Sequence, residues 1–157
     1  MEQTVAKDDP DPKALACYGL LRTDENRVWL RFVDGRPISS VTTQYLDWCC
    51  ERLAAEGKTA LLLVWDNASW HVSKEVQAWV QQHNRQVRQS GWGVRLVICA
   101  LPVKSPWLNP IEPRWAHGKR KVVEPARLLS APELAERVCG HFRCPYEPHL
   151  TIPEKVT

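Results

Sequence analysis

The sequence lacks any long apolar run. Its most continuous apolar stretch, Thr59 to Trp65, is far shorter than the roughly 18 to 20 residues that a membrane-spanning helix needs. The first twelve residues are polar and acidic, without the apolar centre of a signal peptide. Neither a membrane partner nor secretion is therefore expected, and we predict a cytoplasmic location.

Internal repeats are missing, and the net charge is only +3, which does not by itself identify a nucleic-acid-binding protein. The 157 residues are 44% apolar and 25% charged, a composition typical of a soluble globular protein. The length fits one domain of ordinary size. The six cysteines lie mostly in apolar periodic segments, so we expect reduced thiols.

The pattern of apolar residues predicts a mixed α/β domain. Residues 1–13 have nothing to bury and are predicted to be a disordered lead to a domain at 14–145, which a polar tail at 146–157 follows. The segments Ala14–Leu21 and Arg27–Val33 predict a β-hairpin. The rest predicts a helix from Ser39 or Ser40 to Gly57, a strand at Thr59–Trp65, a helix from Ser73, a strand at Val94–Leu101, and helices at about Ile111–Lys121 and Ala131–Phe142.

Asp66 comes directly after the most apolar predicted strand. In open α/β sheets, ligands and catalytic groups collect at the carboxyl ends of the strands, so Asp66 is a candidate catalytic residue. Its alternative role is to cap the following loop through Asx-type hydrogen bonds. His71 lies near the same strand end and could bond a carboxylate or a phosphate, although a surface histidine without a role is the alternative.

Glu112 is a second candidate carboxylate, at the start of a predicted helix. The run Asn109-Pro110-Ile111-Glu112 fits a helix start with Asn109 as N-cap, Pro110 at the first position and Glu112 in a capping box. Pro113 could instead move the cap to Glu112 itself. In both cases the helix dipole favours the ionised carboxylate, which could serve as a metal ligand.

Two carboxylates on separate elements suit magnesium-dependent phosphodiester chemistry, but such a site normally needs a third carboxylate. Basic residues after Glu112 could contact DNA phosphates or could form a solvated helix surface; they include Arg114, Lys119, Arg120 and Lys121. Arg85, Arg88 and Arg95 form a looser second group.

A zinc site is a further possibility at the C-terminal end of the sequence. Cys139, His141, Cys144 and His149 are of the residue types that bind zinc. Their spacing is irregular, and Cys139 continues an apolar helical face. We therefore favour a packing role for Cys139 over a zinc ligand.

Two motifs carry a resemblance to a known family. Residues 64–71 read Val-Trp-Asp-Asn-Ala-Ser-Trp-His, and residues 101–112 read Leu-Pro-Val-Lys-Ser-Pro-Trp-Leu-Asn-Pro-Ile-Glu. The pair resembles the C-terminal catalytic part of mariner-like bacterial insertion-sequence transposases, which are DDE superfamily endonucleases. The resemblance covers roughly Ala14 to Lys121.

The resemblance implies a ribonuclease-H-like mixed sheet flanked by helices. It also implies a carboxylate triad that binds two Mg²⁺ or Mn²⁺ ions, for strand cleavage and strand transfer on double-stranded DNA at transposon terminal repeats. By resemblance, Asp66 is the second carboxylate and Glu112 the third, and Trp115 anchors the helix of Glu112 in the core. The supporting residues would be Asn67, His71, Asn109 and Pro110.

The sequence departs from the family pattern at the first aspartate, which the family carries on a central strand before the hairpin. Here only the polar lead precedes the hairpin, and no aspartate of that lead or of the turns, Asp24 and Asp34 included, lies in an apolar strand. The family's N-terminal helix-turn-helix region is not found either. The 45 residues between Asp66 and Glu112 look longer than the family interval, with Arg85 to Gly93 as the expected insertion.

Two interpretations of this departure stay open. The chain could be one half of a split transposase, completed by an upstream transposase half or by a fusion. It could also be a decayed, non-catalytic remnant that binds DNA or a full-length transposase and regulates it. Some other ribonuclease-H-like nuclease is a weaker third alternative.

Overall fold

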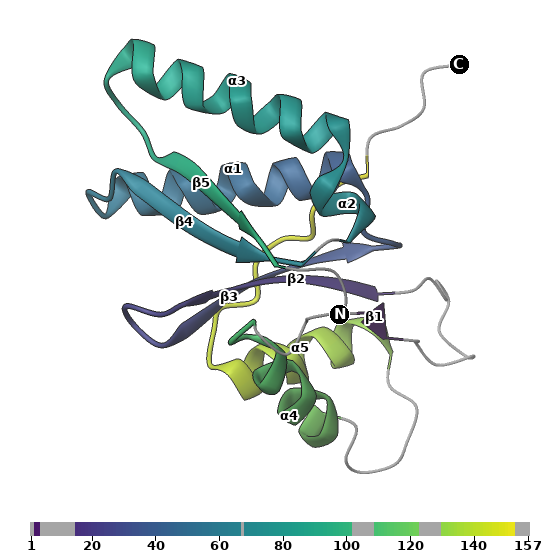
Figure 1. The fold of residues 1–157 in the computed structure, drawn as a ribbon. Helices are drawn as coiled ribbons and strands as arrows, with labels where there is room; N and C mark the ends of the chain where they lie inside the picture. The colour runs from purple at the N-terminus through teal and green to yellow at the C-terminus, as the bar shows by residue number, and fades with distance from the viewer. Residues whose placement is uncertain (1, 4–14, 67, 102–108, 123–129, 153–157) are drawn as a thin grey trace, which may run out of the picture. The chain divides into compact units, whose positions relative to one another are not determined.

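The computed structural model describes residues 2–3, 15–66, 68–101, 109–122 and 130–152 (Figure 1). The chain divides into two compact units, of which unit 1 contains residues 1–37 and 110–152 and unit 2 contains residues 38–109 and 153–157. Each unit is a mixture of strands and helices, as the sequence predicts, and we describe each by itself. No helix of the described segments is long and apolar enough to cross a membrane.

Unit 1 contains an antiparallel sheet of β1 (Glu2–Gln3), β2 (Leu15–Arg22) and β3 (Arg27–Asp34), in the order β1-β2-β3. The predicted hairpin is confirmed, because β2 and β3 pair along their whole length, from Leu15 opposite Asp34 to Arg22 opposite Arg27. Asn26 closes the turn at a positive φ of 57°, a conformation that Asn tolerates better than most residues do.

Two helices of unit 1 follow in the chain, α4 (Glu112–Val122) and α5 (Ala131–Phe142). Ser130 caps α5 by accepting a hydrogen bond from the Glu133 amide at 3.3 Å. The apolar stripe of α5 packs on alternate residues of the hairpin because every second strand residue points to the same face. The resulting core cluster contains Leu15, Cys17, Val28, Leu30 and Phe32 from the strands and Leu134, Ala135, Val138 and Cys139 from the helix.

The segment after α5 runs along β3. The Leu150 amide donates a hydrogen bond to the Phe32 carbonyl at 2.8 Å, and Val33 and Leu150 form an isolated parallel bridge. The Arg31 guanidinium donates twice to the Pro148 carbonyl, at 2.9 and 2.7 Å. These bonds cover part of the edge of β3, so the first residues of the predicted tail are integrated into unit 1.

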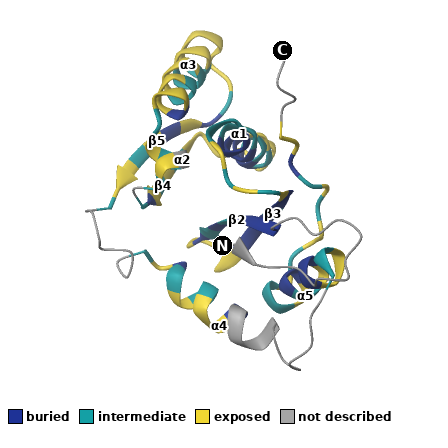
Figure 2. Ribbon diagram, turned by 90° about the vertical axis from the view of Figure 1, so that its right-hand side faces the viewer, coloured by how far each residue is buried: buried dark blue, intermediate teal, exposed yellow. Residues whose placement is uncertain are grey.

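Unit 2 contains α1 (Ser39–Ala55), β4 (Ala60–Trp65), α2 (Ser69–Val72), α3 (Lys74–Ser90) and β5 (Arg95–Ala100). The strands β4 and β5 are parallel and pair from Ala60 opposite Arg95 to Trp65 opposite Ala100. A core cluster of Leu46, Trp65 and Val76 joins α1, β4 and α3. Figure 2 shows the contrast between the buried face of α1 and the mostly exposed α3.

Three details differ from the sequence analysis. The described strands form two separate small sheets instead of one. Within the predicted disordered lead, Glu2 and Gln3 pair with Ala16 and Leu15, which a strand can do through its backbone alone, without an apolar side chain to bury. The four-residue helix α2 was not predicted, because a single helical turn is too short to show a period of apolar residues.

Candidate active site

Asp66 lies at the carboxyl end of β4, as the sequence analysis predicts. The neighbouring strand ends beside it, since the Leu101 amide donates to the Trp65 carbonyl at 2.9 Å. Oδ1 of Asp66 accepts hydrogen bonds from the Ala68 amide at 3.0 Å and from Nδ1 of His71 at 2.8 Å. The first of these is the Asx-type bond of the alternative interpretation, so Asp66 both closes the loop and presents a side chain that is 42% exposed.

The imidazole of His71 is held from two sides. It stacks on the indole of Trp65 with ring centroids 4.7 Å apart and an angle of 3° between the planes. Trp65 in turn packs against Leu46 and Val76. Burial lowers the pKa of His71 and outweighs the opposing effect of Asp66, so the ring is neutral at pH 7. The neutral ring bonds Oδ1 of Asp66 by donating from Nδ1, so Nε2 is the acceptor nitrogen of the ring.

Glu112 is the first residue of α4 in unit 1. At the start of this helix, the Ile111 carbonyl accepts hydrogen bonds from the Arg114 amide at 3.0 Å and the Trp115 amide at 3.1 Å. Ile111 therefore occupies the cap position that the sequence analysis gave to Asn109 or Glu112. Pro113 follows within the first turn, where an amide hydrogen has no partner in the helix. Glu112 lies in the first turn of α4, at the end of the helix where the dipole is positive.

Trp115 anchors α4 in the core of unit 1, as the resemblance implies. Its indole packs against the core cluster and meets the ring of Phe142 edge to face, with centroids 5.4 Å apart. Gly19 of β2 lies directly against this indole, and a Cβ at that position would overlap it. The absence of a side chain at Gly19 thus allows Trp115 to reach the sheet.

The remaining predicted site residues differ in what the structure describes of them. Arg114 donates a hydrogen bond from its guanidinium to the side chain of Asn26 in the hairpin turn. Lys119, Arg120 and Lys121 lie within α4, but their side chains are outside the described residues. Asn67 is outside the described residues too, whereas Asn109 and Pro110 form the bend and turn before α4.

The structure brings Asp66 and His71 together within unit 2, while Glu112 belongs to unit 1. The structure thus describes the surroundings of Asp66 and of Glu112 one at a time. That the two carboxylates form one site is a prediction. Among the described residues, no group of three or more Asp, Glu, His or Cys side chains could hold a metal ion. Because Mg²⁺ requires several oxygen ligands, the described residues alone do not fit a complete magnesium site.

The proposed zinc set does not form a cluster among the described residues either. Cys139 and Cys144 instead take part in the C-cap of α5, where Arg143 has a positive φ of 53° and the Cys144 amide donates to the Cys139 carbonyl at 3.1 Å. A contact between the side chains at these two positions is typical of this helix ending. The packing interpretation of Cys139 is confirmed by its place in the core cluster.

Comparison with known families decides the relationship of the chain. The family profile described as DDE superfamily endonuclease matches residues 13–135, more than half of the sequence. The chain belongs to this family. No match was found among curated proteins.

The DDE endonuclease match includes both Asp66 and Glu112, together with β2 to β5 and the beginning of α5. It thus supports the superfamily that the two motifs indicate. Two contacts around the candidate residues were not predicted from the sequence, namely the stacking of His71 on Trp65 and the contact of Trp115 with Gly19. For the stacking of His71, the sequence offered one indication, namely that Trp65, Asp66 and His71 lie in the same motif.

Proposed function

We propose that this DDE endonuclease is the C-terminal catalytic part of a mariner-like insertion-sequence transposase. It cleaves and joins DNA strands at transposon terminal repeats in a reaction that depends on Mg²⁺ or Mn²⁺. The observation that carries the proposal is the carboxylate of Asp66, fixed by His71 at the end of an apolar parallel strand within the family match. Family membership also supports Glu112 as the third carboxylate of the triad, with Asp66 as the second.

The first carboxylate of the triad completes the proposed site from outside the described residues. Among the described strands, β4 pairs only with β5, and β1 covers only Ala16 and Leu15 of β2. Both β2 and β4 therefore have backbone donors and acceptors that a further strand could pair with. We propose that a segment encoded upstream, in the same or another polypeptide, supplies this strand and the first aspartate of the triad.

The test is strand nicking of a DNA duplex that carries the terminal repeats, with Mg²⁺ or Mn²⁺, by the chain alone and after mixing with the upstream-encoded polypeptide. We expect nicking only in the mixture. Asp66→Asn and Glu112→Gln should each abolish nicking and leave the circular dichroism spectrum unchanged, since each change preserves side-chain size. Glu51→Gln, which removes an exposed carboxylate from α1, is the matched control and should retain full activity.

A second candidate function is a non-catalytic DNA- or transposase-binding remnant. It is supported by the basic residues of α4, Arg114, Lys119, Arg120 and Lys121, since such residues can bind DNA phosphates without any catalysis. DNA binding without nicking in either the chain alone or the mixture would support this candidate. Nicking by the chain alone would instead show that the first carboxylate of the triad is already present in this polypeptide.

A further inference from the structure

The helix α3 has one buried face, and that face is fixed to β5. Val76 is fully buried, and His83 bonds the Val94 carbonyl through Nε2 at 2.7 Å. The Asn84 amide group bonds both backbone groups of Leu96, donating to the carbonyl at 2.9 Å and accepting from the amide at 2.8 Å. These bonds set the rotation of α3 about its axis, so the opposite face is held in solvent.

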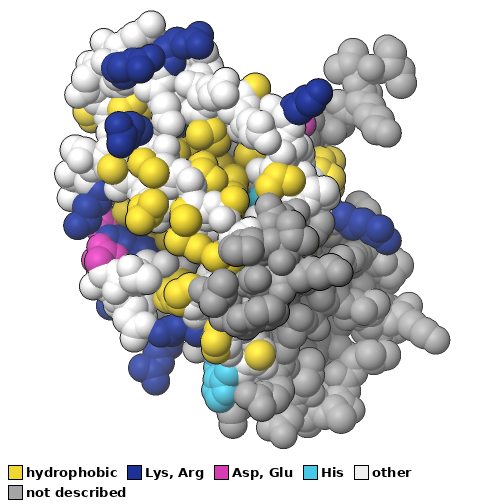
Figure 3. All heavy atoms as spheres, viewed as in Figure 1, with side chains coloured by type: hydrophobic (Ala, Val, Ile, Leu, Met, Phe, Trp, Pro, Cys, Tyr) yellow, Lys and Arg dark blue, Asp and Glu magenta, His cyan; other side chains and the backbone are white. Residues whose placement is uncertain are grey.

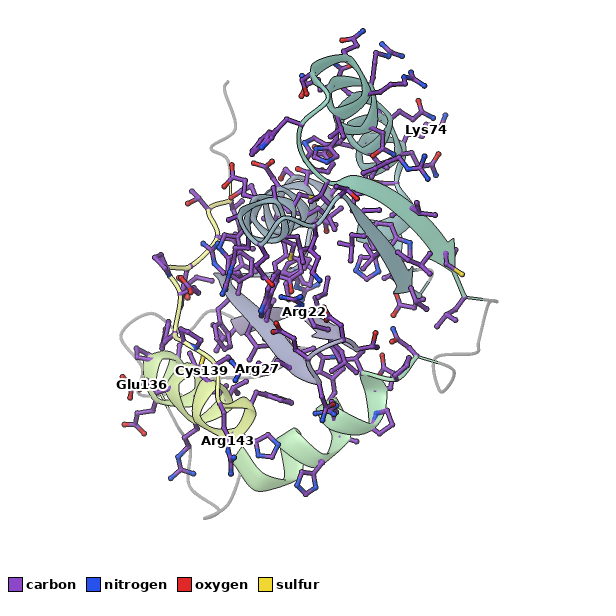
Figure 4. The ribbon with its side chains drawn as sticks, turned by 90° about the vertical axis from the view of Figure 1, so that its left-hand side faces the viewer. Arg22, Arg27, Lys74, Glu136, Cys139 and Arg143 are labelled. Carbon is purple, nitrogen blue, oxygen red and sulfur yellow. The ribbon has the colours of Figure 1, made fainter. Side chains whose placement is uncertain are left out.

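The solvent face of α3 carries a basic stripe, defined here as Lys74, Arg85 and Arg88. At about 100° per residue these three positions lie within roughly 60° of one another, and the stripe is about 21 Å long. All three residues are exposed, and within the described part of the chain none of them pairs with a carboxylate. Lys and Arg side chains gather over α3 in Figure 3, and Lys74 lies on the side of α3 away from α1 in Figure 4.

The polar residues around the basic stripe are almost free of acidic groups. Between Lys74 and Trp92 the only acidic residue is Glu75, in the first turn. The other polar positions include five glutamines, Gln77, Gln81, Gln82, Gln86 and Gln89. Glutamine amides donate hydrogen bonds without adding negative charge, so the face attracts an anionic polymer and can also bond it.

An exposed tryptophan follows the basic stripe. Trp92 is 71% exposed, the highest value among the described large apolar side chains. It lies between Gly91 and Gly93, whose φ angles of 69° and 111° turn the chain sharply after α3. The Ser90 hydroxyl accepts from the Trp92 amide at 3.2 Å and donates to the Trp92 carbonyl at 3.1 Å, so the loop backbone is tied to the helix end.

We propose that α3 and the 91–93 loop form a DNA-binding surface, on which the basic stripe contacts backbone phosphates and Trp92 stacks on an unpaired base. The proposal rests on the proposed function, because it assumes that DNA is the substrate. A row of cations beside an exposed aromatic ring is the combination that binds single-stranded nucleic acid, since the cations follow the backbone and the ring covers a base. Its residues are not among the candidate carboxylates Asp66 and Glu112, so the surface adds a contact for DNA beside an unpaired base.

The unpaired base distinguishes this partner from other anions. An acidic protein would satisfy the basic stripe, but it offers Trp92 a flat ring only where it exposes an aromatic side chain, whereas every base of a single strand has a π-face. A fully paired duplex would offer phosphates, but its bases are stacked on one another. The structure therefore favours a junction between duplex and single strand, such as a cleaved or frayed DNA end.

The experiment measures binding of the complete chain, by fluorescence anisotropy, to a short labelled duplex that is either blunt or carries a single-stranded overhang. Arg85→Gln combined with Arg88→Gln should weaken binding to both DNAs and lower the slope of log K against log salt by about 2, since each phosphate contact contributes about 0.9. The matched control is Arg27→Gln with Arg36→Gln, which removes the same charge from exposed positions of unit 1 and should leave the slope close to the wild-type value.

Trp92→Ala should weaken binding to the overhang DNA by about 5-fold or more and leave blunt DNA within about 2-fold, because stacking requires an unpaired base. Trp92→Phe should retain most of the overhang preference. An equal loss on both DNAs, or equal salt slopes for the two arginine pairs, would overturn the proposal. If the α3 variants still bind DNA normally and the wild-type mixture nicks it, the α3 surface is rejected and the proposed function stands. If the variants lose binding as expected but the wild-type mixture does not nick DNA, the proposed function is rejected and the α3 surface stands.

Discussion

Nδ1 of His71 donates a hydrogen bond to Oδ1 of Asp66 across 2.8 Å, while the His71 ring stacks on Trp65. The bond fixes one oxygen of the carboxylate, and the stack fixes the plane of the imidazole. His71 is thus a positioning residue for Asp66, and its protonation state affects both the site and the stability of unit 2.

The stability of the fold should fall with acid because of His71. Burial lowers the pKa of His71 in the folded chain, so the unfolded chain binds this proton at a higher pH. The contribution of neutral His71 to the free energy of unfolding is fully present above pH 6.5, the pKa of histidine in the unfolded chain. It is lost as the pH falls through the lower pKa of the folded chain. As the pH is lowered across this range, the free energy of unfolding, measured with urea, should therefore decrease more steeply for wild type than for His71→Gln. Parallel curves would contradict this account.

Gly19 should be intolerant of even one added methyl group. A Cβ on Gly19 would overlap the indole of Trp115, so Gly19→Ala should lower the free energy of unfolding by about 1 to 3 kcal/mol through overpacking. The measurement is urea unfolding followed by circular dichroism. Gly140→Ala is the matched control, because no atom lies within 4 Å of its added Cβ, and alanine in a helix should stabilise by about 0.5 to 1 kcal/mol. Similar effects of the two substitutions would exclude the contact with Trp115 as the cause.

Most helices and strands were predictable because their apolar periods are strong. The hairpin, the β4 and β5 strands and the α5 helix lie within a residue or so of the predicted bounds. Ser73 was predicted to begin a helix and does cap α3, accepting from the Val76 amide at 3.2 Å. These features depend on neighbouring residues in the sequence, so local patterns are sufficient to find them.

Features that depend on distant residues were not predictable. The helix α1 was expected to begin at Ser39 or Ser40, but its cap is Ile38, whose carbonyl accepts from the Val41 and Thr42 amides. The Ser39 hydroxyl instead donates to the Ser73 hydroxyl at 2.7 Å, a partner 34 positions away. The sequence of the predicted tail did not predict its hydrogen bonds to β3, because these bonds join residues more than 100 positions apart. Asp66 and Glu112 were identified from motifs, and no local pattern reports which side chains from other segments complete their surroundings.

The cysteines should differ widely in their rate of alkylation. Burial raises the pKa of both Cys17 and Cys50 to about 12, whereas Cys99 is exposed. A hydrogen bond from the Cys139 thiol lowers the pKa of Cys144. Since the thiolate is the reactive form, iodoacetamide at mild alkaline pH should modify Cys99 and Cys144 well before Cys17 and Cys50. Mass spectrometry of quenched samples gives the order, and in denaturant all six cysteines should react alike. Fast modification of Cys17 in the native chain would be inconsistent with its burial.

The segment after α5 should detach from β3 when His149 is removed. Nδ1 of His149 bonds Oδ2 of Asp34 at 2.8 Å, and its Nε2 bonds the Tyr146 hydroxyl at 2.6 Å. The bond to Asp34 orders the chain immediately before Leu150, whose amide pairs with the Phe32 carbonyl. His149→Ala should therefore speed hydrogen exchange at the Leu150 amide and lower the free energy of unfolding by about 1 kcal/mol, a small value because these side chains are partly exposed.

Tyr146→Phe separates the two bonds of His149. It removes only the hydroxyl and keeps the stacked rings of residues 146 and 149, whose centroids are 5.6 Å apart. Because the bond to Asp34 remains, exchange at the Leu150 amide should stay close to that of wild type in Tyr146→Phe. If Tyr146→Phe instead speeds exchange as much as His149→Ala does, then the hydroxyl holds the segment and Asp34 contributes little. If neither variant changes hydrogen exchange at the Leu150 amide, then the backbone bonds to β3 and the Arg31 bonds to Pro148 hold the segment without the His149 side chain.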